Sequence, residues 1–230
     1  MRCDPLFADR YDAGSRLAEA LATYRDRDPI VLALPRGGVP IGFQVAKALH
    51  APLDVLLVRK IGAPGQPELG LGAVVDGSDP QTVLSPSVVA AVAPPPGYIE
   101  AETERQLAEI ERRRRRYTGD RPPPAPSGRT VIVVDDGIAT GGTVRAALRG
   151  LARSSPARLV LAVPVAPTDS LAELKPECDE IVCLATPEPF YAVGQHYRDF
   201  TQTEDDEVVR LLDEARQWVT EGAPPPRAKI

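Results

Sequence analysis

The sequence predicts an α/β fold with a central, mostly parallel sheet flanked by helices. Short apolar runs alternate with longer segments of helical periodicity, and strands separated by helices of about ten residues are typical of βαβ units. Glycine-rich loops directly follow two of the apolar runs, where parallel sheets bind their ligands. At 230 residues and 43% hydrophobic content, the chain is large enough for one domain with a sizeable core.

Helical spacing of apolar residues predicts most of the helices, which we expect at residues 12–25, 39–49, 143–152, 171–174 and 204–220. A further, highly charged helix is expected at residues 98–117, where Glu109–Arg113 and Glu111–Arg115 have the spacing of i,i+4 ion pairs. Apolar runs predict strands at residues 30–34, 53–58, 131–134, 159–165 and 180–184.

The most informative segment runs from Val131 to Thr143. Four apolar residues are followed by two adjacent carboxylates, a loop of small residues and the start of a helix. Free backbone N–H groups and a helix N-terminus in such a loop can hold a phosphate, and the carboxylates can hold a polyhydroxylated group. The segment has neither the Gly-Lys-Ser/Thr of a Walker A loop nor the Gly-x-Gly-x-x-Gly of a dinucleotide fold.

This segment resembles the phosphoribosyl-pyrophosphate (PRPP) signature of the type I phosphoribosyltransferases. The resemblance implies that Asp135 and Asp136 hold the ribose hydroxyls, directly or through water on a Mg²⁺ ion. It also implies that the loop after them wraps the 5′-phosphate; this part of the site comprises Gly137, Ile138, Ala139, Thr140, Gly141, Gly142 and Thr143. Gly137 departs from the family, which usually has an aliphatic residue there, and the sequence does not explain it.

A second loop ends the first predicted strand and contains Pro35, Arg36, Gly37 and Gly38. The glycines let a phosphate approach the backbone, and Arg36 adds a bidentate donor. Alone, such a sequence is equally compatible with a tight turn. Beside the first motif it is similar to the pyrophosphate loop of the same family, which often contains a non-proline cis peptide; we place that bond between residues 35 and 37.

The segment from Arg59 to Gly72 is rich in glycine and proline and is interpreted as too irregular for a helix or strand. The family has a flexible lid at this position. Arg59 and Lys60 would then meet the pyrophosphate and Glu68 would close over the site, so that water is excluded from the reaction. A surface loop with solvated charges is an equally good interpretation for Glu68.

A third candidate segment, residues 186–203, corresponds to the family's variable hood over the sheet, which binds the acceptor. Phe190, Tyr191 and Tyr197 are candidates for stacking on an acceptor base, although each could instead pack the hood onto the core. We treat residues 1–221 as a single domain with a helical insertion and proline-rich linker at 94–128, and expect the tail over 222–230 to be disordered.

The amino-acid composition disfavours several classes of binding partner. A net charge of −5 and few histidines disfavour a nucleic-acid binder or a histidine-rich metal site, and no apolar stretch reaches transmembrane length. The five arginines over residues 112–116 could hold an anion or nucleic acid, but they are interpreted as the solvated end of a long helix. Three cysteines and no evident signal peptide favour a cytoplasmic protein, and a homodimer remains open.

The implied activity is transfer of phosphoribose from PRPP, with Mg²⁺, to a nitrogenous acceptor and release of pyrophosphate. Arg36, Lys60 and Glu68 are the candidate catalytic residues. The 6-oxopurine enzymes carry an aspartate where this chain has Ala139, so a 6-oxopurine acceptor is disfavoured. Two alternatives remain: a PRPP-sensing regulator on the same fold, and a phosphate-ester enzyme that uses Asp135 and Asp136 with a metal.

Overall fold

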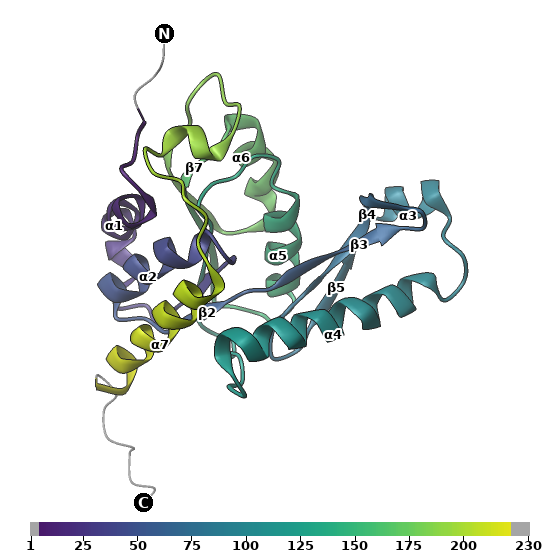
Figure 1. Cartoon of the computed structure of the whole chain (residues 1–230), viewed down its shortest axis with the longest axis horizontal. Coiled ribbons are helices and arrows are strands. Elements are labelled where there is room, and N and C mark those ends of the chain that lie inside the picture. The colour runs from purple at the N-terminus through teal and green to yellow at the C-terminus, as the bar shows by residue number, and fades with distance from the viewer. Residues whose placement is uncertain (1–4, 222–230) are drawn as a thin grey trace, which may run out of the picture.

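The centre of the molecule is a sheet of five parallel strands in the order β2-β1-β6-β7-β8 (Figure 1). The structure is a computed structural model that describes residues 5–221, so the tail over 222–230 lies outside the described residues. The strands are β1 (Pro29–Ala33), β2 (Leu53–Val55), β6 (Thr130–Val134), β7 (Arg158–Val165) and β8 (Glu180–Ala185). The predicted α/β fold with a parallel sheet is confirmed.

Helices cover both faces of this sheet (Figure 1). On one face lie α1 (Arg10–Ala20), α2 (Gly38–Leu49) and α7 (Asp205–Glu221), and on the other α5 (Gly142–Ala152) and α6 (Thr168–Leu174). Single turns of 3₁₀ helix are η1 (Ala22–Tyr24), η2 (Lys175–Glu177) and η3 (Val193–His196). Within residues 5–221, no helix is both long enough and apolar enough to cross a membrane.

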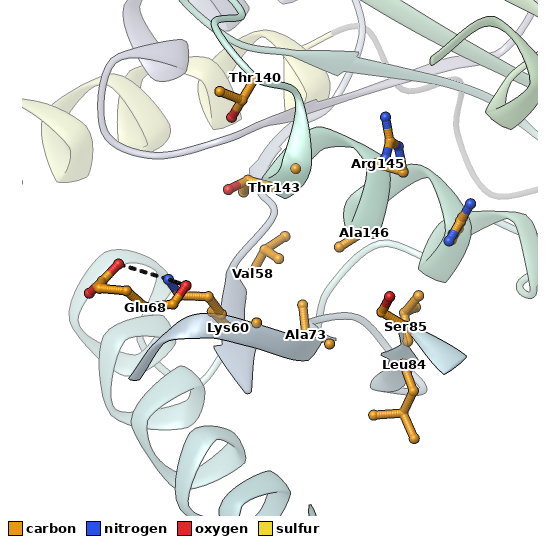
Figure 2. Close-up of a pocket in the computed structure, with 15 residues that line it drawn as sticks. Val58, Lys60, Glu68, Ala73, Leu84, Ser85, Thr140, Thr143, Arg145 and Ala146 are labelled. Atoms are coloured by element: carbon orange, nitrogen blue, oxygen red, sulfur yellow. Dashed lines mark hydrogen bonds and ion pairs between the residues drawn. The ribbon is translucent and has the colours of Figure 1, made fainter. Parts of the chain in front are cut away.

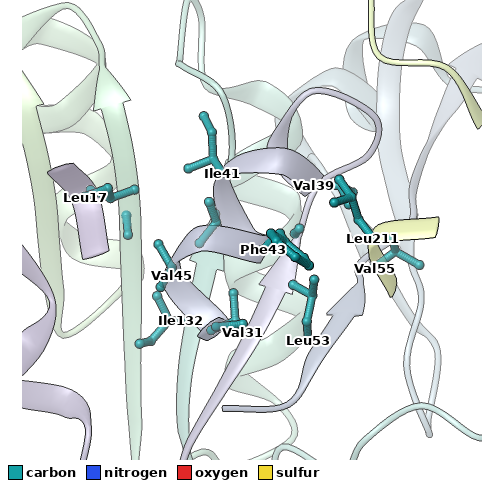
Figure 3. Close-up of a cluster of buried hydrophobic side chains, with 14 of the residues drawn as sticks. Leu17, Val31, Val39, Ile41, Phe43, Val45, Leu53, Val55, Ile132 and Leu211 are labelled. Carbon is teal, nitrogen blue, oxygen red and sulfur yellow. The ribbon is translucent and has the colours of Figure 1, made fainter. Parts of the chain in front are cut away.

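The side chains of the central strands alternate between two apolar clusters. Val31 and Ile132 point toward the face of α2, where they join the cluster in Figure 3, whereas Ile30 and Val131 pack on the opposite face. All four are fully buried, and burial of such side chains stabilises the fold by about 1.5–3 kcal/mol each. This double-sided burial explains why these strands are continuous apolar runs in the sequence.

An arm projects from the core (Figure 1). It contains an antiparallel sheet of β3 (Val58–Ala63), β4 (Gln66–Val75) and β5 (Gln81–Leu84), together with α3 (Pro86–Val92) and α4 (Tyr98–Thr118). The predicted charged helix is confirmed as α4, with both expected ion pairs. Neither β5 nor α3 was expected.

The interpretation of residues 59–72 as irregular is wrong, because they form most of the β3–β4 hairpin. Two register shifts around Gly62 interrupt the ladder there. A Cβ atom at Gly62 would lie 2.7 Å from the Pro67 carbonyl oxygen, so the strands approach more closely than a side chain allows. Glycines that weaken a strand pattern in the sequence are here what lets the two strands pair. The predicted strand over 53–58 is likewise divided, since β2 ends at Val55 and β3 begins at Val58.

The arginine run is only partly solvated. Arg112, Arg113, Arg115 and Arg116 are at least 41% exposed, but the side chain of Arg114 is 11% exposed. Its guanidinium donates to Asp54 at the β2 strand and, over 2.7 Å, to Asp76 just after β4. One arginine of the run therefore joins α4 to the core and the arm, which corrects the interpretation of the whole run as a solvated helix end.

Candidate functional site

The paired carboxylates lie immediately after β6, at the carboxyl edge of the parallel sheet. Asp135 accepts a 2.9 Å hydrogen bond from the backbone N–H of Asp136. Oδ2 of Asp136 accepts two hydrogen bonds from Arg10, from Nε at 2.9 Å and from Nη2 at 2.8 Å. Burial raises the pKa of both carboxyl groups, more strongly at Asp135, and the positive charge of Arg10 opposes the rise at Asp136.

The two glycine-rich loops are brought together against these carboxylates. A Cβ atom at Gly37 would lie 1.9 Å from Oδ2 of Asp136, and one at Gly38 would lie 2.7 Å from the carbonyl oxygen of Val134. Only glycine permits this contact between the loops that follow β1 and β6. The peptide bond between Pro35 and Arg36 is cis, which confirms the expected position of a non-proline cis bond.

The predicted phosphate loop ends at the N-terminus of α5. Gly141 has a left-handed backbone conformation, with φ +71°, and α5 begins at the next residue. Ile138 is buried in the core, whereas Ala139 and Thr140 are exposed. Ile138 therefore anchors the loop in the core, while the residues after it are accessible to a ligand. The unpaired N–H groups at the N-terminus of a helix favour a bound anion at such a position.

A cavity of 540 Å³ separates this loop from the arm. Figure 2 shows Thr140 and Thr143 on the loop side and Lys60, Glu68, Ala73 and Ser85 on the arm side. Nζ of Lys60 donates to Oε2 of Glu68 over 2.9 Å, while Glu68 itself is 95% exposed. Two of the three candidate catalytic residues thus line a cavity that also borders the phosphate loop.

Arg59 lies on the other side of the arm. Consecutive side chains of a strand point to opposite faces, so Arg59 and Lys60 cannot both point into this cavity. Arg59 instead donates from Nε to Oε1 of Gln106 on α4, over 3.0 Å. The expectation that both cations meet the pyrophosphate is corrected: only Lys60 lines the cavity. Arg36 points toward α4 and α7, with nitrogen–oxygen distances of 3.6 Å to Glu204 and 3.8 Å to Asp205.

The hood aromatics have different surroundings. Tyr191 is 74% exposed, and the Phe190 ring lies 5.0 Å from that of His196. Tyr197 is buried between Phe7 and Phe200, and its hydroxyl donates to the backbone oxygen of Asp136 over 2.6 Å. Because its ring has no open face, the interpretation of Tyr197 as a stacking platform for an acceptor is corrected: it packs the hood onto the core and holds Asp136.

Arg10 is the main residue that the sequence did not point to. Besides its two hydrogen bonds to Asp136, it donates to the backbone oxygen of Thr201 over 2.8 Å. Its guanidinium also stacks on the Phe200 ring at 3.9 Å. Arg10 follows Asp9, the N-cap of α1, and belongs to no recognisable motif. Its partner Asp136 is 126 positions away, so no local signal could have identified it.

The structure explains the glycine at position 137. A Cβ atom there would lie 2.5 Å from Cγ1 of Val193 in η3 and 3.0 Å from Cγ1 of Val165 at the end of β7. The hood therefore packs directly on the loop after the carboxylates, in space that an aliphatic side chain would need.

Replacing Gly137 by isoleucine should consequently lower the free energy of unfolding by about 1–3 kcal/mol, because overpacking forces neighbouring groups apart. Chemical denaturation measures this loss, and hydrogen exchange should show faster opening of residues 190–200. Adding Val193→Ala should recover part of the stability. Wild-type stability in Gly137→Ile would contradict the close packing.

This combination of fold and loops defines a class of protein. The model of the phosphoribosyl transferase domain family matches residues 9–189, and the chain belongs to this family. The match includes both glycine-rich loops, the paired carboxylates and the whole arm. The family resemblance noted in the sequence is thereby confirmed.

Individual relatives agree with this assignment. Two curated Mycobacterium tuberculosis proteins, provisionally named as phosphoribosyl transferases, are 49% identical over 219 residues. The match covers 95% of this chain and 49% of each relative, so the chain spans about half the length of the curated relatives it matches. The crystal structure of TT1426 from Thermus thermophilus is similar with a TM-score of 0.79 and 45% identity, covering 90% of this chain and 98% of that one.

Proposed function

We propose that the chain binds PRPP and transfers its phosphoribose to a nitrogenous acceptor, with release of pyrophosphate. The observation that carries this proposal is the contact of the two glycine-rich loops at the carboxyl edge of the sheet. Gly37 and Gly38 hold the loop after β1 against Asp135 and Asp136, and the phosphate loop follows in the same chain segment. The pyrophosphate, the ribose and the 5′-phosphate of PRPP could therefore bind side by side at this edge of the sheet.

Each part of the site has a chemical role in this proposal. The N–H groups over residues 140–143 and the N-terminus of α5 would hold the 5′-phosphate. Asp135 and Asp136 would accept hydrogen bonds from the ribose hydroxyls. The backbone N–H of Gly37 would meet the departing pyrophosphate, together with Arg36 and Lys60, whereas the N–H of Gly38 already donates to the carbonyl oxygen of Leu34 over 3.1 Å. Stabilisation of the charge that develops on a leaving group commonly contributes most to such catalysis.

The carboxylates fit a Mg²⁺ ion that is carried partly by the substrate. Residues 5–221 contain no group of three or more acidic, histidine or cysteine side chains that could hold a metal alone. Mg²⁺ usually keeps several waters and uses one or two carboxylates together with substrate phosphates, which matches a pair of aspartates. When bound, Mg²⁺ would neutralise charge on the pyrophosphate.

The hood would set the choice of acceptor. Phe190 and Tyr191 remain the candidates for stacking, and Glu68 with Lys60 would close the arm side of the cavity. Ala139 has no carboxylate for a 6-oxopurine, so we propose that the acceptor belongs to another class. Adenine, a purine that carries a 6-amino group in place of the 6-oxo group, is therefore the first acceptor to test.

The test is to incubate the protein with PRPP, Mg²⁺ and a panel of bases, and to follow pyrophosphate by ³¹P NMR. We expect base-dependent release. In Asp135→Asn/Asp136→Asn, PRPP affinity should fall at least tenfold, whereas the exposed control Asp120→Asn should behave as wild type. Unchanged affinity in the double variant would overturn the site. Tight PRPP binding without turnover of any acceptor would favour the sensing regulator.

A further inference from the structure

A second cavity, of 240 Å³, lies beyond the pyrophosphate loop and is lined mainly by arginine. It is formed where the C-terminal part of α4 meets the start of α7. Its lining residues are Arg36, Arg112, Arg113, Arg116, Tyr117 and Asp205. Three of the cations come from the arginine run of α4, which the proposed phosphoribosyl transfer does not use. The fourth comes from the pyrophosphate loop itself.

Most of the charged groups that line this cavity are cationic. Four arginines and one aspartate give its lining a net charge of +3. Asp205 is shared: it accepts a 2.6 Å hydrogen bond from the Tyr117 hydroxyl and also lies 2.8 Å from Nη1 of Arg116. Further carboxylates, on Glu109, Glu204 and Asp206, contact the same arginines from outside the lining. These carboxylates offset the positive charge in the wider surroundings, but they lie outside the lining, so the groups that face an anion inside the cavity are mainly guanidiniums.

Most of the guanidinium donors are available. A guanidinium carries five N–H donors. In the part of the chain that the structure describes, Arg112 donates from Nε and Nη2 and Arg113 from Nε alone, all to Glu109. Within residues 5–221, Arg36 makes two long contacts, both to carboxylates at the start of α7. Arg114, next in the chain, contrasts with them because two buried aspartates occupy its Nη atoms.

We propose that this cavity is a binding site for an oligophosphate anion, distinct from the PRPP site but joined to it through Arg36. Planar guanidinium groups match phosphate oxygens bidentately, so several of them around one cavity favour a ligand with more than one phosphate group. A singly charged carboxylate would gain little over the carboxylates already in contact. Binding here would occupy Arg36 and so compete with its role at the pyrophosphate loop.

The proposal rests on the proposed function only for this competition; the binding itself requires neither PRPP nor Mg²⁺. Isothermal titration of the full chain with inorganic tripolyphosphate, in Mg²⁺-free buffer with EDTA, therefore tests it separately. We expect Arg112→Ser/Arg113→Ser to weaken binding at least tenfold. Arg115→Ser is the matched control, since Arg115 belongs to the same run but pairs with Glu111 outside the cavity, and it should stay within twofold of wild type.

A further titration, with ATP, identifies the source of the phosphate groups. If ATP binds with the same dependence on Arg112 and Arg113, the ligand class includes nucleotides; if only tripolyphosphate does, it is the free anion; both results support the site. In wild-type protein, tripolyphosphate should also shift the Nε–H resonances of Arg112 and Arg113, which needs no variant. Equal binding by Arg112→Ser/Arg113→Ser and Arg115→Ser overturns the proposal. So does binding of a single-stranded RNA that needs these arginines when tripolyphosphate does not.

Discussion

Replacing Arg10 by methionine is expected to lower the free energy of unfolding by about 3–5 kcal/mol, because it leaves the Asp136 carboxylate buried without its partner. The two side chains are only 10% and 17% exposed, and Arg10 donates two hydrogen bonds to Oδ2 of Asp136. The same change should reduce PRPP affinity or turnover about 10- to 100-fold, as loss of a group that orients a ligand-binding side chain commonly does. Denaturant unfolding and PRPP titration measure the two effects.

Two further variants test whether the loss of stability in Arg10→Met comes from the unpaired charge of Asp136. Arg16→Met removes an exposed arginine from the same helix, where its i,i+4 pair with Asp12 should be worth about 0.3–0.5 kcal/mol. Adding Asp136→Asn to Arg10→Met removes the unpaired charge, and should restore stability without restoring PRPP binding. If Arg10→Met were no more destabilised than Arg16→Met, Arg10 would not be what neutralises Asp136.

Arg10 also connects the hood with the carboxylates. Its contacts to Thr201 and Phe200 come from the same segment as Tyr197, whose hydroxyl holds the Asp136 backbone. Burial raises the pKa of Tyr197, so its hydroxyl keeps the proton that it donates. The segment proposed to select the acceptor is therefore attached to the residue proposed to hold the ribose. A hood displaced by Gly137→Ile should for this reason also weaken PRPP binding.

The motifs that could be predicted from the sequence are contiguous. The phosphate loop and the pyrophosphate loop each place a strand end, small residues and a helix start within one stretch, so local order is enough to identify them. The strands β1 and β6 were likewise predicted from uninterrupted apolar runs, and the structure shows that their residues are buried on both faces of the sheet. The structure adds that Gly37 touches Asp136, which turns two separate motifs into one site.

The residues that escaped prediction act through distant partners. Arg114 is 60 positions from Asp54 and 38 from Asp76, and sequence periodicity cannot show which member of an arginine run points inward. The direction of the Arg59 side chain follows from its position in β3. Glycine and proline residues prevented the prediction of a strand there, so this direction could not be predicted either. The sequence cannot show that Tyr197 is buried in contact with the rings of Phe7 and Phe200, which leaves no face of its ring for an acceptor.

Replacing Arg114 by methionine should also lower the free energy of unfolding by about 3–5 kcal/mol at neutral pH, since two buried carboxylates lose their common partner. Burial already raises the pKa of Asp76, and Arg114 opposes this rise. Without Arg114 the folded state should bind a proton at Asp76 still more tightly than the unfolded chain does. The stability deficit of the variant should therefore be smallest below the ordinary aspartate pKa of about 3.9 and grow as pH rises through the raised value.

Comparing the variant with wild type at each pH removes the general effect of acid on the fold. Arg115→Met is the control: its exposed pair with Glu111 should contribute little, and its deficit should not follow pH in this way. Arg114→Met/Asp54→Asn/Asp76→Asn should recover stability at neutral pH, because neutral amides replace the unpaired charges. A deficit in Arg114→Met that stayed constant with pH and persisted in the triple variant would mean that Arg114 anchors α4 by packing rather than by charge. Since α4 carries three arginines of the second cavity, the same variant should also weaken tripolyphosphate binding.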